Sequence, residues 1–554
     1  MTKPFSSLSK RQILRDIQAQ EYDLLVIGGG ITGAGIALDA QVRGINTVLI
    51  EMQDFAAGTS SRSTKLVHGG LRYLKQLELK LVAEVGRERA IVYENAPHVT
   101  TPEWMLLPMI EGGTYGKFAT SIGLRVYDAL AGVKKSERRI MLNKEQTLAK
   151  EPLLAKEKLK GGGYYVEYRT DDARLTMEVM KEAVRRGATA INYMKAEDLL
   201  YENGRVYGVM AIDQFSGEKI TIRAKKIINA AGPWVDTIRE IDGSKKGKRL
   251  HITKGVHLVI DKKRFPLNQA IYFDTPDGRM VFAIPRDNKT YVGTTDTNYQ
   301  GDIANPKMTV EDRDYILRAA NFMFPSLKLT GADVESSWAG LRPLIHEDGK
   351  SPSELSRKDE IFLSESGLLT IAGGKLTGYR KMAERIVDLL VEQFKTEGQG
   401  NYPCCTTDKI RLSGGDVGGA DKFELFKTEK IKEGVSIGLS EWEAEQLVAR
   451  YGSNVSQIFS RISECEAERA QAGLPAQVFG PLMYAIEEEM AMTPEDFFVR
   501  RTGDLYFHIQ GVRDWKEPVI AYMAKKLGWS TEETATHKKR LEQVIHDAVI
   551  PLSE

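Results

Sequence analysis

The chain has 554 residues, of which 42% are hydrophobic, and its formal net charge is +1. This length exceeds what one hydrophobic core usually supports, so two or three domains are expected, and the near-zero charge excludes a general attraction to nucleic acid. Three cysteines are too few for a disulfide framework, have no metal-ligand spacing, and predict a cytoplasmic protein without a metal site.

Residues 22–51 have the pattern of a dinucleotide-binding strand–turn–helix–strand unit. Gly28 permits a tight turn after a buried strand, and Gly30 lets a pyrophosphate approach the N-terminus of the next helix. Gly33 lets that helix pack closely on the strand. Glu51 ends the second strand, where a carboxylate can bind ribose hydroxyls and disfavours a 2′-phosphate. NAD and FAD both remain possible ligands of this unit, and an ordinary βαβ unit with a Gly-rich turn is the alternative.

Residues 57–74 form a second unusual stretch, rich in hydroxyls and then in basic and aromatic side chains. This composition suits contact with a phosphate or polyol, whereas a solvated Ser/Thr loop is the competing interpretation. Residues 131–139 carry Lys134, Lys135, Arg138 and Arg139. They predict either a solvated basic face or a contact with an anionic membrane surface.

The middle of the chain alternates between strand patterns and glycine-marked junctions. Residues 206–212 and 219–228 predict a hairpin, and the strand that ends before Gly232 indicates a close approach to the backbone. Residues 251–335 predict an antiparallel sheet. The run 368–378 predicts a second strand–glycine–helix junction, whose helix N-terminus can face a ligand.

The pattern of the last part of the chain predicts helices. The Gly-rich segment 395–422 has no strong periodicity and is the best domain boundary. Helix-start patterns follow at 440–443, 493–496 and 530–533. We therefore expect a separate domain of helices over 423–554.

With these segments placed, the chain resembles the FAD-dependent glycerol-3-phosphate dehydrogenases of the aerobic, quinone-linked kind. The matching stretches run in order through nearly the whole chain: VIGGGITGAGIALDA, TSSRSTKLVHGGLRYL, INAAGPW, TKGVHLVI, YVGTTDT, LRPL, IAGGKLTGYRKMAE and RRTGDLYF. One departure is Thr32, where some members have Asn. Related oxidases carry an insertion that this length does not obviously accommodate, which favours a dehydrogenase.

The resemblance implies FAD and an α/β fold. This fold has a Rossmann-type FAD-binding domain of the amino-acid-oxidase kind, a mixed-sheet substrate domain and an all-α C-terminal domain. The expected boundaries are 20–80, 160–245 and 336–394 for the FAD-binding domain, 81–159 and 246–335 for the substrate domain, 395–422 for a linker, and 423–554 for the helical domain. The residues expected to bind the cofactor are Gly28, Gly30, Thr32, Gly33, Glu51, Thr59, Ser60, Ser61, Lys65, His68, Gly69, Gly232, Gly374, Lys375 and Leu376.

The implied reaction is oxidation of sn-glycerol 3-phosphate to dihydroxyacetone phosphate by hydride transfer to FAD. An Arg fork suits the substrate phosphate, and the expected substrate-binding residues are Arg72, Tyr73, Arg342 and Arg357. His257 and His68 are candidate bases, because their ordinary pKa lies near neutral pH. We place His257 as the base, His68 near the flavin, and Lys375 where it can stabilise negative charge on the flavin or bind substrate. Buried core histidines and surface ion pairs are the alternatives for these residues.

The expected partners are glycerol 3-phosphate and a quinone acceptor, with no nucleic acid. Peripheral contact with the inner face of the membrane and a homodimer are both compatible with the resemblance. Three other functions stay open: a flavin amine or amino-acid oxidase on the same fold, an oxygen-using glycerol-3-phosphate oxidase, and a nucleotide-binding regulatory or scaffold protein.

Overall fold

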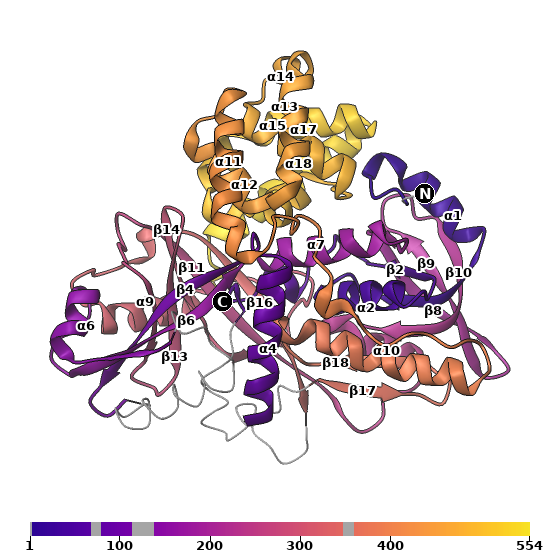
Figure 1. The fold of residues 1–554 in the computed structure, drawn as a ribbon, viewed down its shortest axis with the longest axis horizontal. Coiled ribbons are helices and arrows are strands. Elements are labelled where there is room, and N and C mark those ends of the chain that lie inside the picture. The colour runs from indigo at the N-terminus through magenta and orange to yellow at the C-terminus, as the bar shows by residue number, and fades with distance from the viewer. Residues whose placement is uncertain (1–2, 68–78, 114–137, 347–358, 554) are drawn as a thin grey trace.

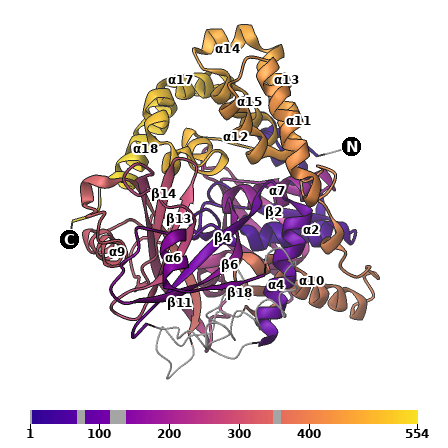
Figure 2. The same ribbon diagram turned by 60° about the vertical axis from the view of Figure 1, so that its left-hand side comes forward.

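The structure is a computed structural model that describes residues 3–67, 79–113, 138–346 and 359–553. It contains two β-sheets side by side and a group of helices that lies over both (Figure 1). Turning the molecule by 60° leaves these helices, which lie within residues 423–549, on the same side of the two sheets (Figure 2). The fold class predicted from the sequence is confirmed.

The first sheet has a parallel centre, in the order β18-β10-β1-β2-β7. The antiparallel strand β17 pairs with β18, and the predicted hairpin is present as β9 and β10, which pair antiparallel. Parallel strands are buried on both faces, which explains their continuous apolar runs. The strands are β1 (Glu21–Ile27), β2 (Thr47–Ile50), β7 (Thr189–Ile191), β8 (Met194–Glu202), β9 (Arg205–Asp213), β10 (Lys219–Asn229), β17 (Glu360–Leu363) and β18 (Leu369–Ala372).

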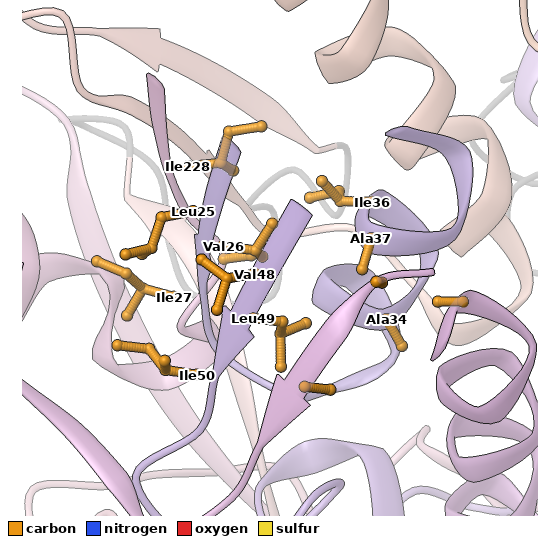
Figure 3. Packing of buried hydrophobic residues seen from close by; sticks show 14 of the residues in the cluster. Leu25, Val26, Ile27, Ala34, Ile36, Ala37, Val48, Leu49, Ile50 and Ile228 are labelled. Carbon is orange, nitrogen blue, oxygen red and sulfur yellow. The ribbon is translucent and has the colours of Figure 1, made fainter. Parts of the chain in front are cut away.

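Helix α2 (Ile31–Val42) covers one face of this sheet (Figure 3). Val26 of β1 and Leu49 of β2 point toward Ala34 and Ala37 of the helix, and all four are buried. The small side chains on α2 let the helix lie close to the strands. A Cβ on Gly33 would lie 1.9 Å from the carbonyl oxygen of Gly28, so this position accepts only glycine, as the packing role predicted for Gly33 requires.

The second sheet is mostly antiparallel, as residues 251–335 predict, with one parallel pairing between β12 and β4. Its longest pairing joins β11 to β16 and sets the register of the site described below. The strands are β3 (Leu66–Val67), β4 (Thr100–Ile110), β5 (Ile140–Leu142), β6 (Leu159–Thr170), β11 (Arg249–Asp261), β12 (Ala270–Asp274), β13 (Met280–Arg286), β14 (Lys289–Gly293), β15 (Thr297–Asn298) and β16 (Val334–His346).

Three strands of this second sheet fall in segments that the sequence assigns to the FAD-binding domain. β3 lies within 20–80, and β6 and β16 stand at the starts of 160–245 and 336–394. An apolar strand pattern does not show which of two sheets the strand joins, because that depends on hydrogen bonds to distant segments. The domain boundaries themselves stay a prediction.

The remaining helices cover the sheets and build the C-terminal region. Those associated with the sheets are α1 (Lys10–Gln18), α4 (Leu79–Asn95), α6 (Lys144–Lys150), α7 (Asp172–Arg185), α8 (Val235–Ile241), α9 (Val310–Met323) and α10 (Tyr379–Thr396). The C-terminal ones are α11 (Phe423–Ser436), α12 (Glu441–Tyr451), α13 (Val455–Glu464), α14 (Glu466–Ala472), α15 (Ala476–Glu488), α16 (Asp504–Phe507), α17 (Ile509–Leu527) and α18 (Thr531–Val549).

Two of the predicted helix starts are capping boxes in the structure. Ser440 caps α12 and Ser530 caps α18, each with a Glu three residues later. The third pattern, at 493–496, leads into a π-helix, η10 (Asp496–Arg501). Within the described parts of the chain, no helix is both long enough and apolar enough to cross a bilayer.

Candidate cofactor and substrate site

Residues from both sheets line a cavity of about 1140 Å³. Clefts for drug-sized ligands measure about 300–1,000 Å³, so this cavity has room for a dinucleotide with a small substrate beside it. Most of the described residues predicted to bind ligand lie in its wall: Gly28, Gly30, Thr32, Glu51, Thr59, Ser60, Gly232, His257, Arg342, Gly374, Lys375 and Leu376.

The turn between β1 and α2 presents backbone N–H groups to the cavity. Gly28 has φ +114°, a conformation that favours glycine, and a Cβ there would lie 2.5 Å from the carbonyl oxygen of Ala230. Gly30 is the N-cap of α2 and has no side chain to satisfy the first turn. The Ser60 hydroxyl accepts the N–H of Ile31 at 2.9 Å. The other backbone N–H groups in the first turn of α2 are suited to binding a diphosphate.

The Glu51 carboxylate is held beside this turn by backbone donors. Its Oε2 accepts the N–H of Gly29 at 2.7 Å, and its Oε1 accepts the N–H of Gln53 at 2.8 Å. Burial raises the pKa of Glu51, whereas these two donors act in the opposite direction. A carboxylate fixed in this way at the end of β2 can accept hydrogen bonds from ribose hydroxyls.

Two further glycine junctions contribute to the wall. Gly373 and Gly374 follow β18 with φ values of +75° and +82°, and a Cβ on Gly374 would lie 2.4 Å from the Met382 sulfur. This turn brings Lys375 and Leu376 to the cavity. Gly232 follows β10 in the same way, with φ +55°.

Of the described residues predicted to bind the cofactor, three are not among those that line the cavity: Gly33, Ser61 and Lys65. Gly33 packs α2 on β1. The Lys65 amine donates to the Asp172 carboxylate at 2.6 Å and to the Ser61 carbonyl at 3.0 Å. Both Ser61 and Lys65 are buried, so the structure gives them positions behind the 59–64 loop, whose other residues form the wall.

His257 lies in the middle of the second sheet, on β11. It pairs with Gly293 of β14 on one side and with Trp338 of β16 on the other. Its ring stacks on the Trp338 ring at a centroid distance of 4.7 Å and an angle of 12°. Its Nε2 lies 3.1 Å from the Thr64 hydroxyl. Burial lowers the pKa of His257 well below its ordinary value, and the positive charges of Arg342 and Lys65 lower it further. The imidazole is therefore neutral near pH 7.

Arg342 projects from β16 on the same face of the sheet. It pairs with Thr253, four residues before His257 on β11, and cross-strand partners and residues four apart on a strand share a face. The guanidinium donates to the Thr295 carbonyl at 3.2 Å and to the Thr294 hydroxyl at 3.1 Å. It also lies 3.4 Å from the Asp296 carboxylate. The structure thus brings a neutral imidazole and a fixed cation into one cavity.

Sequence reasoning did not single out the residues that hold these two side chains. A Cβ on Gly255 would lie 2.4 Å from Arg342 Nη2, and one on Gly293 would lie 2.3 Å from His257 Cδ2. Glycine inside a strand marks a close approach by another group, so this signal was available in the sequence. Thr64 and Trp338, which contact the His257 ring, carry no such signal.

Five predicted site residues lie outside the described parts of the chain: His68, Gly69, Arg72, Tyr73 and Arg357. Lys134 and Lys135 of the basic segment do so as well, whereas Arg138 and Arg139 are described.

The model of the FAD-dependent oxidoreductase family matches residues 23–380, and the model of the C-terminal domain of alpha-glycerophosphate oxidase matches residues 405–534. A curated relative, the aerobic glycerol-3-phosphate dehydrogenase of Bacillus subtilis (strain 168), is 61% identical over the full length of both chains. The chain belongs to the aerobic glycerol-3-phosphate dehydrogenases.

Two other members support the same assignment. The aerobic glycerol-3-phosphate dehydrogenase of Staphylococcus aureus (strain USA300) is 56% identical over 98% of both chains. The X-ray structure of the glycerol-3-phosphate dehydrogenase from Bacillus halodurans, complexed with FAD, is 55% identical and covers 99% of each chain with a TM-score of 0.87. The resemblance identified from the sequence motifs is confirmed. So is the expectation of an FAD-dependent dehydrogenase, since both the FAD-dependent oxidoreductase model and these dehydrogenases match.

Proposed function

We propose that the cavity binds FAD together with sn-glycerol 3-phosphate, and that the chain oxidises the C2 alcohol of this substrate to the ketone of dihydroxyacetone phosphate. The observation that carries the proposal is the composition of the cavity wall. A helix N-terminus and a carboxylate at the end of β2 line the same space as a neutral histidine and a fixed arginine. The family assignment supports both the cofactor and the substrate.

The residues in the wall fit FAD. The turn at Gly28 and Gly30 would hold the diphosphate at the α2 N-terminus, and Glu51 would hold the ribose. The junction that carries Lys375 supplies a cation where negative charge on the reduced cofactor needs a counter-charge. FAD, when bound, supplies the hydride acceptor for the reaction.

Arg342 is the proposed phosphate ligand. A guanidinium presents its N–H groups in a planar fork that matches the oxygens of a phosphate. Its contacts with Thr294 and Thr295 fix the plane of the fork before substrate arrives. The nearby Asp296 carboxylate is partly exposed, so it competes only weakly for the same donors.

His257 is the proposed base. Oxidation removes a hydride from C2 and a proton from the C2 hydroxyl, and a neutral imidazole can accept that proton. The stack on Trp338 and the Thr64 hydroxyl hold the ring in one orientation. Binding of an anionic phosphate near the ring raises the proton affinity of the imidazole, because an opposite charge stabilises the protonated form.

We further propose that the electrons pass to a quinone, and that residues 134–139 contact an anionic membrane surface to reach it. This step is tested by liposome flotation of a variant in which Lys134, Lys135, Arg138 and Arg139 are changed to Gln. Lost flotation with vesicles rich in anionic lipid, at unchanged flavin content, supports the contact. Unchanged flotation contradicts it.

The reaction itself is tested by anaerobic titration of the purified protein with glycerol 3-phosphate. We expect stoichiometric bleaching of the flavin absorbance at about 450 nm, followed by its recovery when a quinone analogue is added. Bleaching by glycine or sarcosine in place of glycerol 3-phosphate would indicate an amine oxidase instead. Rapid recovery in oxygen alone would indicate an oxidase, and a colourless protein would indicate a regulatory or scaffold role.

A further inference from the structure

The C-terminal helical region reaches the loop that follows Glu51. The contact is made by Arg500 and Arg501, at the end of the π-helix η10 and the start of the RRTGDLYF stretch. Arg501 donates to both oxygens of the Asp54 carboxylate, Nη1 to Oδ2 at 2.7 Å and Nη2 to Oδ1 at 2.8 Å. Arg500 donates to the same carboxylate through Nε at 2.5 Å. All three side chains are buried.

In the sequence, Asp54 lies between two segments that line the cavity. Glu51 precedes it, and Ala57 to Ser60 follow it in the wall of the cavity. Ala57 donates its N–H to the Asp54 carbonyl at 3.1 Å, and Ala56 donates its N–H to the Gly29 carbonyl at 3.0 Å. Hydrogen bonds therefore link the loop 51–57 both to the glycine turn after β1 and to the C-terminal region.

The C-terminal partners of Asp54 are themselves held in place. Arg501 donates from Nε and Nη2 to the Glu489 carbonyl, at 3.2 and 2.8 Å, and Arg500 donates to the Asp496 carboxylate at 2.7 Å. Asn192, at the end of β7, donates to both Asp54, at 2.9 Å, and the Met490 carbonyl, at 3.0 Å. Burial alone would raise the pKa of Asp54, but the two guanidinium groups, Arg501 foremost, hold it below its ordinary value. A bidentate, buried pair with this support fixes geometry as well as charge.

We propose that Arg500 and Arg501 are positioning residues for the cofactor. By anchoring Asp54 they hold the loop 51–57 in the conformation that aims Glu51 at the ribose and keeps residues 57–60 in the wall. The helical C-terminal region is then part of the FAD site without touching FAD. This inference rests on the proposed placement of the FAD ribose at Glu51.

A second buried link offers a matched control. Arg174 of α7 binds Glu489 of the C-terminal region through both Nη atoms, and both side chains are buried. This pair joins the same two parts of the molecule, yet neither residue lines the cavity or belongs to the loop 51–57. Substitution of Arg174 therefore loosens the same interface by removing a contact of the Glu489 carboxylate, while the Glu489 carbonyl that Arg501 contacts and both guanidinium groups on Asp54 are kept.

The test compares the Arg501→Lys and Arg174→Lys holoenzymes. Each is diluted, and FAD release is measured by the recovery of flavin fluorescence, with thermal unfolding recorded at saturating FAD. We expect Arg501→Lys to raise the Kd for FAD about tenfold, equivalent to about 1.4 kcal/mol. Arg174→Lys should lower the melting temperature by about as much as Arg501→Lys does. Its Kd for FAD should stay within about twofold of the Kd of the protein with its original sequence.

The inference is overturned if Arg501→Lys leaves the Kd unchanged, or if Arg174→Lys raises it equally. Should Arg501→Lys fail to fold, Arg500→Lys replaces it, because Arg501 then still binds Asp54. We expect that variant to raise the Kd about threefold, and an unchanged value again overturns the inference. If heat denaturation of the protein with its original sequence releases no FAD, the proposed function is overturned, and this inference with it.

Discussion

Replacing Arg342 with Ala tests the phosphate site most directly. A hydrogen bond to a charged group is worth about 1.5–3 kcal/mol, so losing a single contact with the phosphate lowers kcat/KM about 10- to 150-fold. Among the internal contacts of Arg342, the Asp296 carboxylate is 34% exposed, and a partly exposed ion pair contributes only about 0–1 kcal/mol to stability.

Steady-state kinetics with an artificial electron acceptor, and competitive inhibition by inorganic phosphate, measure the effect. The KM for glycerol 3-phosphate and the inhibition constant for phosphate should rise together in Arg342→Ala, and by a smaller factor in Arg342→Lys, which keeps the charge but not the fork. Arg279→Ala is the control, because it removes the same charge from an exposed position in the wall. The reasoning is refuted if Arg342→Ala keeps the original kcat/KM, or if Arg279→Ala loses as much.

Three further results are expected. Gly293→Ala places a methyl group 2.3 Å from His257 Cδ2, so kcat/KM should fall about 100-fold at unchanged flavin content; a fall of less than about threefold contradicts the assignment of the base. Because burial and neighbouring cations lower the pKa of His257 below 6.5, kcat/KM should stay level down to about pH 6.5 and decline only in more acid solution; an acid limb above that pH counts against this base. Asp54, Glu178 and Glu489 have lowered pKa values in the folded protein, so their stabilisation is complete above their unfolded values, about pH 4, and is lost as the pH falls through the folded ones. Urea midpoints recorded from pH 6 to pH 3 should therefore decrease, and a flat series would exclude this linkage.

The cofactor end of the site could be predicted from sequence because its determinants are local. Gly28, Gly30 and Glu51 lie within one strand–turn–helix–strand unit, and each has a fixed place in that geometry. The structure puts all three in the cavity wall. Lys65 shows the limit of this reasoning. A lysine in a hydroxyl-rich loop suggests an anion, but its partner is Asp172, which lies 107 residues further along the chain.

The substrate end could not be derived in the same way. His257 and Arg342 come together only through the register of β11 against β16, and no local pattern sets a register between strands so far apart. The family resemblance suggested these two residues. The residues that contact their side chains were not identified from the sequence. The contact of Thr64 with His257 spans 193 residues, and the C-terminal arginines reach Asp54 across 447.

The first sheet has a consequence for how the chain emerges from the ribosome. Its central strand β10 completes its pairing only with β18, and Asn229 donates to the Thr370 hydroxyl across 141 residues. Until that segment is synthesised, the buried end of β10 at Ile228 and Asn229 lacks its β18 partner, and open strand edges are templates for aggregation. We expect fragments that stop between β10 and β18 to be less soluble than the full-length polypeptide.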